Sequence, residues 1–259
     1  MYRVSPFKEY LADLRTRILR IAIVVAFITI FCMTFDIDYF YLSGYEIPLP
    51  YPNPVKNIAT QLIHTMSENL LPKNVKLIQF TPQGAFVTQL YVAALLGVIL
   101  AIPVVVREMV GFVGPGLYQS EKAIIKKVTL PSLVLFTIGC LFSYFIVIPY
   151  TVDFLYKYGE SIGVNTFFNI SEFIPFIMQF LLVFGLSYQL PIIMYAITQF
   201  KIVKPIFWRN NLRYVIIILV IFAAVITPDG SGITMWFVAT PMLLLYFAGM
   251  MITKWQIKS

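Results

Sequence analysis

The sequence predicts an all-α membrane protein with six transmembrane helices in a kinked, cupped bundle, both termini cytoplasmic and the last two helices short. Three observations predict this fold. Apolar residues make up 59% of the 259 residues and charged residues only 12%, against about 25% charged in a typical soluble domain. The charges cluster and leave long charge-free runs between them. The basic residues also concentrate in alternate intervening segments.

The charge-free runs define the spans, because about 20 apolar residues cross a bilayer as a helix. We expect spans at about 18–35, 80–106, 128–152, 173–200, 214–228 and 232–253, and a large outer segment over 36–79. The fifth run is short, about 21 Å at 1.5 Å per residue. The chain contains no internal repeat or low-complexity tract, so we expect 1–259 to form a single integral membrane domain.

Prolines interrupt most of the expected spans. They lie at positions 103, 131, 149, 175, 191 and 241. Each one inside a helix removes a backbone hydrogen bond and bends the helix. Repeated bends favour a cupped bundle over a straight one.

Basic residues set the orientation. With a cytoplasmic N-terminus, the inner segments hold 15 of the 19 Lys and Arg residues. The outer segments keep Lys56, Lys73, Lys76 and Lys157. Positive charge concentrates on the cytoplasmic side of membrane proteins, so both termini are expected there, in the cell membrane. The formal charge of +7 then matches anionic lipid headgroups and does not indicate nucleic acid.

The outer segment contains two recognisable stretches. IPLPYPNP (47–54) has a proline at alternate positions and must run extended or as polyproline II. Apolar residues then recur at helical spacing from Val55 to Leu70, which predicts an amphipathic helix.

The residues that an enzyme would need are missing from the sequence. There is no glycine-rich loop with Lys-Ser/Thr for a nucleotide and no intramembrane histidine beside a nucleophile. No His/Cys/Asp cluster has metal-ligand spacing. No charged residue lies deep within a span, which also disfavours an ion-coupled transporter. We therefore expect no catalytic residues, no metal and no cofactor.

Gln189 is the most central polar residue of the fourth span. One interpretation is an interhelical hydrogen bond within the bundle, typically worth about 0.6–2 kcal/mol. The other is a docking point for the helix of a partner. The residues alone leave both open.

Several motifs appear in order along nearly the whole chain. They are YLADLRTRI (10–18), FVGPGLYQSEK (112–122), FTIGCLFSYFIVIPYTVDF (136–154), FGLSYQLP (184–191), ITPDGSG (226–232) and ATPMLLLYFAG (239–249). The ordered set resembles the TatC family, the receptor subunit of the twin-arginine protein translocase. This resemblance implies a scaffold without catalytic activity that binds twin-arginine signal peptides of folded precursors at the cytoplasmic face.

The resemblance also implies partners and site residues. The implied partners are single-span TatA or TatB subunits, further copies in a larger receptor complex and membrane lipid, with transport driven by the proton-motive force. The implied signal-peptide-binding residues are Asp13, Arg15, Arg17, Phe112, Pro115 and Glu121. The implied partner-docking residues are Tyr188, Gln189 and Pro191, and the outer turn is Pro228-Asp229.

Alternatives remain at the level of residue and of function. Asp13 is spaced to pair with Arg17 on its own helix, and Glu121 would favour the positive N-terminal end of the next helix. The rival functional class is a small-solute channel or secondary transporter. A third is an assembly factor that binds partner spans but no signal peptide.

Overall fold

Helices make up most of the computed structural model, which describes residues 6–42, 45–72, 75–113, 119–163, 167–227 and 232–255. For residues 6–10, 39–42, 45–48, 110–113 and 119–127 only the backbone is described. The chain divides into two compact units, whose boundaries fall near residue 115 and within helices α5 and α6. The first unit comprises residues 1–115 and 156–179, and the second comprises 116–155 and 180–259.

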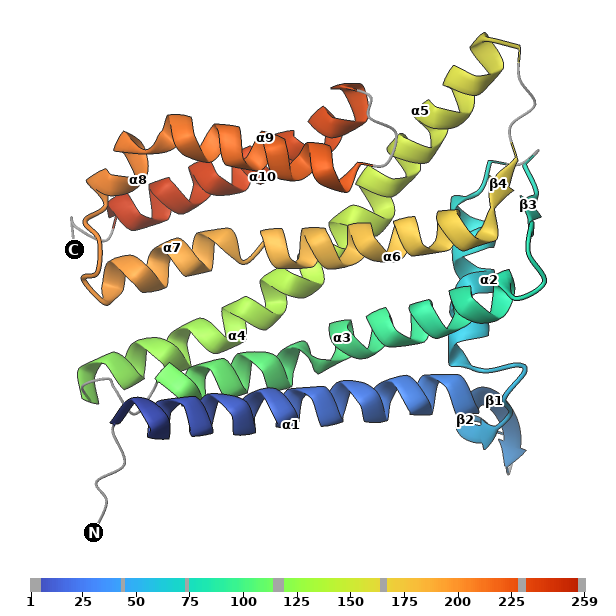
Figure 1. Ribbon diagram of the computed structural model, residues 1–259, viewed down its shortest axis with the longest axis horizontal. Coiled ribbons are helices and arrows are strands. Elements are labelled where there is room, and N and C mark those ends of the chain that lie inside the picture. Colours follow the sequence, from blue (N-terminus) through green and yellow to red (C-terminus); the bar gives the residue numbers. More distant parts are fainter. Residues whose placement is uncertain are drawn as a thin grey trace. The chain divides into compact units, whose positions relative to one another are not determined.

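The first unit contains two long helices that pack against each other. Helix α1 (Pro6–Thr34) lies along helix α3 (Gly84–Val113) for much of its length (Figure 1). Gly97 permits the close approach: a Cβ there would lie 2.6 Å from Thr29 Oγ1 and 3.0 Å from the Val25 carbonyl oxygen. The Thr29 hydroxyl donates to that same carbonyl, so the polar group is satisfied within α1. The contact between the two helices therefore depends on a position without a side chain.

A β-hairpin follows α1, where the sequence predicted only an extended stretch. Strands β1 (Phe35–Leu42) and β2 (Tyr45–Pro52) pair antiparallel along their length. The prolines of β2 occupy alternate positions 48, 50 and 52. Alternate residues of a strand direct their N–H positions to the same edge. The missing donors therefore share one edge and leave the ladder to β1 intact.

Helix α2 (Ile58–Leu70) confirms the amphipathic helix expected in this segment. Asn57 caps it, because its side-chain oxygen accepts from the Thr60 amide at 3.0 Å. The Asn57 amide group also donates to the Met33 carbonyl oxygen at 2.8 Å, near the end of α1. This buried side chain thus joins α2 to α1.

Further contacts in the first unit join segments that are far apart in the sequence. Strand β3 (Leu77–Ile78) pairs parallel with strand β4 (Phe168–Asn169). Helix α6 (Ile170–Ser187) begins directly after β4. The Gln179 amide of α6 donates to the Tyr91 hydroxyl of α3 at 2.8 Å.

The second unit starts with one continuous helical segment. Helix α4 (Gln119–Phe142) passes through a π-helical turn (Ser143–Val147) into helix α5 (Ile148–Ser161). Pro149 lacks an N–H, and the widened turn ends two residues before it, at Val147. Gly139 lets α4 approach α6: a Cβ there would lie 2.6 Å from the Phe184 carbonyl oxygen.

The expected fourth span consists of two helices. Helix α6 ends at Ser187, and helix α7 (Leu190–Gln199) begins after a turn at Tyr188 and Gln189. Pro191 occupies the first turn of α7, where its missing N–H costs no helical bond.

The last three helices complete the second unit. Helix α8 (Ile206–Asn210) precedes helix α9 (Leu212–Ile226), and helix α10 (Gly232–Trp255) packs against both α9 and α7 (Figure 1). Trp208 links α8 to its neighbours: its indole N–H donates to the Thr198 hydroxyl at 3.0 Å, and its carbonyl oxygen accepts from the Tyr246 hydroxyl at 2.7 Å.

Five helical segments of the described chain are long and apolar enough to cross a membrane. They are Leu11–Thr34, Gly84–Met109, Val128–Ser161, Ile170–Gln199 and Gly232–Trp255. Helix α9 is apolar but has only 15 residues. Several large apolar side chains of α1 are exposed, including Phe27 at 69%. Such a surface suits contact with lipid rather than water. The protein is therefore a multi-pass membrane protein.

Candidate functional site

The expected peptide-binding residues are described to different extents. Asp13, Arg15 and Arg17 lie on α1 with their side chains described. Phe112 lies near the end of α3 and Glu121 near the start of α4, each with only its backbone described. Three further expected residues, Pro115, Pro228 and Asp229, lie outside the described residues.

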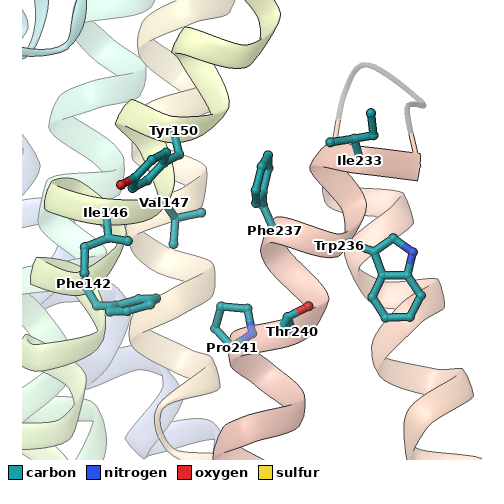
Figure 2. Close-up of a pocket in the computed structure, with 9 residues that line it drawn as sticks. All are labelled: Phe142, Ile146, Val147, Tyr150, Ile233, Trp236, Phe237, Thr240 and Pro241. Carbon is teal, nitrogen blue, oxygen red and sulfur yellow. The ribbon is translucent and has the colours of Figure 1, made fainter.

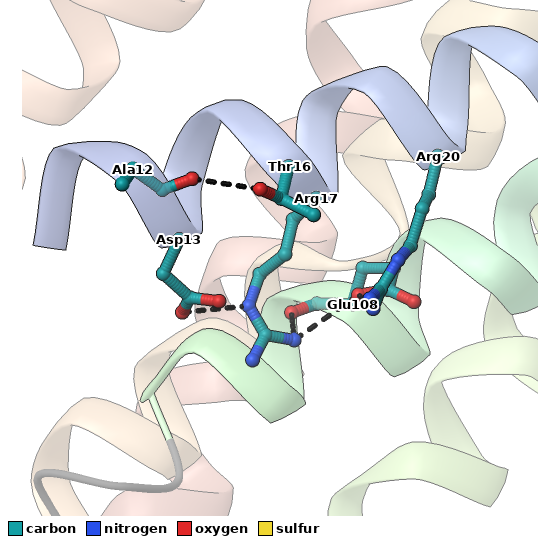
Figure 3. Close-up of polar contacts among 6 residues, drawn as sticks. All are labelled: Ala12, Asp13, Thr16, Arg17, Arg20 and Glu108. Carbon is teal, nitrogen blue, oxygen red and sulfur yellow. Dashed lines mark hydrogen bonds and ion pairs between the residues drawn. The ribbon is translucent and has the colours of Figure 1, made fainter. Parts of the chain in front are cut away.

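Arg17 is the centre of an ionic cluster between α1 and α3 (Figure 3). Its Nε donates to Asp13 Oδ2 at 2.9 Å, across one helical turn. Its Nη1 donates to Glu108 Oε2 at 3.0 Å and to the Glu108 carbonyl oxygen at 3.3 Å. One guanidinium is therefore held by two carboxylates from two helices.

Arg20 adds a second cation to the cluster. Its Nη1 lies 3.6 Å from Glu108 Oε2, the same oxygen that Arg17 contacts. The Arg20 side chain is 60% exposed, whereas Glu108 is 10% exposed. Glu108 thus lies beneath two arginines one turn apart, and its burial is compensated by opposite charge.

Asp13 differs from Glu108 in accessibility. Its side chain is 41% exposed, although Arg17 occupies one of its oxygens. The i,i+4 pairing expected as the alternative role of Asp13 is present. Because the carboxylate remains open to solvent, it can also accept a bond from a group outside the chain. Arg15, two residues along α1, is exposed as well.

Sequence reasoning missed Glu108 as a site residue. It is one of four acids in the segments expected to be cytoplasmic, the others being Glu9, Asp13 and Glu121. An acid among so many bases was the available signal. The contact to Arg17 joins residues 91 positions apart, so neither spacing nor periodicity could identify it.

Gln189, the expected docking residue, makes its hydrogen bonds within the second unit. Its Oε1 accepts from the Ser132 hydroxyl at 2.5 Å, and its Nε2 donates to the carbonyl oxygens of Ser132 at 3.1 Å and Gly185 at 3.4 Å. Tyr188 packs its ring against Phe142, with 5.8 Å between the ring centroids, and Pro191 is buried. The amide therefore links α4 to the break between α6 and α7.

An apolar pocket of about 600 Å³ lies between the α4–α5 segment and the first half of α10 (Figure 2). Phe142, Ile146 and Tyr150 line one side, and Trp236 and Phe237 line the other. No charged side chain lines it. It can hold an apolar group, but it offers no charge with which to recognise an ionic ligand.

The described residues contain no group of three or more His, Cys, Asp or Glu side chains that could hold a metal ion. The two cysteines, Cys32 and Cys140, are free thiols within apolar helices.

Comparison with known proteins gives concordant matches over most of the chain. A family model described as Sec-independent protein translocase protein (TatC) matches residues 9–241. The TatC protein of Cenarchaeum symbiosum is 48% identical over 94% of this chain and 92% of its own length. TatCy of Bacillus subtilis is 29% identical over 95% of this chain and 87% of its own length.

Solved structures are similar too. A crystal structure of a twin arginine translocase receptor, TatC, superposes with a TM-score of 0.77 at 24% identity, covering 95% of this chain and 98% of that chain. A second structure of a TatC receptor, in the detergent DDM, gives a TM-score of 0.75 at 25% identity, covering 94% and 99%. The fold described above is thus the fold of these proteins.

Proposed function

Because this chain belongs to the TatC family of Sec-independent protein translocase proteins, we propose that it is the receptor that binds twin-arginine signal peptides of folded precursors at the cytoplasmic face. Proteins of this family are translocase components, so the chain is not an enzyme. The observation that carries the proposal is the cluster at Arg17, where two carboxylates from α1 and α3 already hold a guanidinium.

This geometry explains why the ligand would carry arginine. A guanidinium is planar and directs several N–H groups in fixed directions, so it can bond two carboxylates at once, which a lysine ammonium cannot copy. Asp13 and Glu108 contact different nitrogens of the same guanidinium, Nε and Nη1. This pairing with the chain's own Arg17 supports the proposal that the same surface binds an arginine of the signal peptide.

Asp13 and Glu121 are proposed as the two carboxylates that bind the peptide. Asp13 is supported by its exposure of 41%. Glu121 is supported by its place in the FVGPGLYQSEK motif. The remaining proposed residues of the site, Arg15, Arg17, Phe112 and Pro115, come from the same two motifs. Arg17 fixes Asp13, while Phe112 and Pro115 would shape the turn that carries Glu121.

The proposed topology places this site in the cytoplasm. Residues 1–259 would form one membrane domain of six kinked spans in the cell membrane, with α9 as the short fifth span and both termini inside. The support is the concentration of 15 of 19 basic residues in the segments that this topology makes cytoplasmic. Pro228 and Asp229 would then form the outer turn between the last two spans.

Assembly with single-span TatA or TatB subunits, and with further copies of this chain, completes the proposal. Tyr188, Gln189 and Pro191 are proposed to meet the partner span, because the break between α6 and α7 interrupts a lipid-compatible helix. The proton-motive force would drive transport, since the sequence lacks a nucleotide-binding loop.

Signal-peptide affinity tests the proposed site. In nanodiscs at fixed salt, we expect Asp13→Asn and Glu121→Gln each to weaken binding by about ten- to a hundredfold, as for the loss of a charge-assisted bond. Glu9→Gln is the matched control, since it removes the same charge from the same segment as Asp13. An equal loss in the control would mean that diffuse surface charge attracts the peptide and that no defined site exists.

The rival functions predict different co-purification. A receptor retains a tagged twin-arginine precursor from native membranes and releases it when the two arginines are changed to lysines. A small-solute channel or secondary transporter retains neither precursor. An assembly factor retains single-span partners without the precursor.

A further inference from the structure

A second pocket is lined by residues of α8, of the start of α9 and of the end of α10. Its volume is about 710 Å³. Six apolar side chains line it, and two cationic ones, Arg209 and Lys254, complete the lining. It shares no residue with the Arg17 cluster or with the apolar pocket of Figure 2.

The apolar part of this pocket is open to the surroundings. Ile206 is 54% exposed, Phe247 41% and Met251 64%. Met250 and Met251 add unbranched, adaptable side chains to the wall. An open apolar surface of this kind on a membrane protein suits a hydrocarbon chain lying along it rather than a compact polar ligand.

The two cations line the same pocket, and neither has a carboxylate partner among the residues that the structure describes. Arg209 is in the last turn of α8 and Lys254 in the last turn of α10, and both are exposed. Among the ion pairs of the described residues, none includes either side chain. The sequence reinforces this excess, because Asp229 is the single acid after Glu172. The described residues after Glu172 therefore contain no acidic side chain that could neutralise the two positive charges.

We propose that this pocket binds one anionic phospholipid. Its phosphate lies between the Arg209 guanidinium and the Lys254 ammonium, and an acyl chain follows the apolar wall formed by α9 and α10. A partner's apolar helix would cover the same wall but would leave both cations without counter-charge. An anionic phospholipid matches both the apolar side chains and the two cations of the lining, so the charges favour a lipid over the helix of a protein partner.

This site differs from the general attraction of basic segments to a membrane surface. A surface effect is spread over all nearby cations and requires no cavity. Here two cations lie at one pocket, whereas Lys201 and Arg213 of the same segment do not line it. In the topology proposed above, this pocket lies at the cytoplasmic leaflet; the lipid site itself does not depend on that topology.

Native mass spectrometry of the detergent-purified chain, titrated with palmitoyl-oleoyl phosphatidylglycerol, tests the proposal. We expect one tightly retained lipid. Arg209→Gln and Lys254→Gln together should weaken its retention by about 25-fold, or about fivefold for each charge. The matched control is Lys201→Gln with Arg213→Gln, which removes the same charge outside the pocket and should leave the retained lipid in place. The single variants carry the test if the double variant does not fold.

Three results would overturn the proposal. The first is an equal loss in the control pair, which would mean surface charge alone. The second is equally tight retention of palmitoyl-oleoyl phosphatidylcholine, which has no net negative charge. The third is displacement of the lipid by glycerol 3-phosphate, which would indicate a site for a free anion. Neither a precursor nor a signal peptide is present, so failure here leaves the proposed receptor function untouched.

Discussion

Glu108 connects two elements through charge, because one buried carboxylate oxygen contacts both Arg17 and Arg20. It therefore orients the arginine that in turn holds Asp13. If Asp13 binds the signal peptide, Glu108 is a positioning residue for it rather than a contact.

Glu108→Gln is expected to weaken signal-peptide binding by about two- to fivefold, the scale of one partly exposed ion pair. The reason is that Arg17 loses its ion pair with Glu108 and can then bond more completely to Asp13, which leaves Asp13 less available to the peptide. Peptide affinity in nanodiscs measures the effect.

A double-mutant cycle with Arg17→Gln separates positioning from a general loss of structure. If Glu108 acts through Arg17, the Glu108 change has little further effect once Arg17 is absent. Additive losses would show that Glu108 acts on the peptide by another route.

Gln189 presents the opposite situation, since its amide is already used within the chain. Gln189→Leu removes its bonds to Ser132 and Gly185. We expect the protein to lose about 0.6–2 kcal/mol of stability, the range for hydrogen bonds between membrane helices. Thermal unfolding in detergent measures this loss, with Ser132→Ala as the matched change on the other side of the bond.

The same Gln189 variant tests the proposed docking role. Partner crosslinking from cysteines at Tyr188 and Leu190 should fall if the amide meets a partner span. Unchanged crosslinking together with lower stability would restrict Gln189 to packing.

At the scale of elements, helix α9 is the critical case. Its 15 residues extend about 22 Å at 1.5 Å per residue, against a hydrocarbon core of about 30 Å. A span this short requires local thinning of the bilayer. The alternative is a re-entrant hairpin with a buried turn.

We expect the turn after α9 to reach the outer surface. A cysteine introduced at Ser231 should react with a membrane-impermeant thiol reagent added from outside the cell. Cys32 and Cys140 should be replaced first, so that the label reports one position. Absence of labelling at Ser231, with normal labelling at an exposed outer position such as Lys56, would contradict the six-span topology.

Helices and strands could be predicted from the sequence where the pattern that specifies them lies within one continuous segment. Charge-free runs located the five long apolar helices, and helical spacing located α2. The pairing of β1 with β2 was missed, because strand pairing depends on the register between two segments and the expected prolines suggested only an extended chain. The break at Tyr188 and Gln189 was likewise signalled by Pro191 but not placed.

At the scale of the whole molecule, the ordered motifs identified the family, which the comparisons confirm. Only part of the candidate site could be predicted from the sequence. The Asp13–Arg17 pair follows from i,i+4 spacing. Glu108 and the pocket at Arg209 and Lys254 depend on helices that meet only after folding, so no local pattern contains them.

The proline-bearing edge of β2 has a consequence for how many copies of this chain can share a membrane. An open strand edge with regular N–H donors is a template for sheet growth between molecules. Alternate prolines at 48, 50 and 52 remove the donors of three alternate positions along that edge. These prolines therefore disfavour pairing of this edge with a strand of a second molecule.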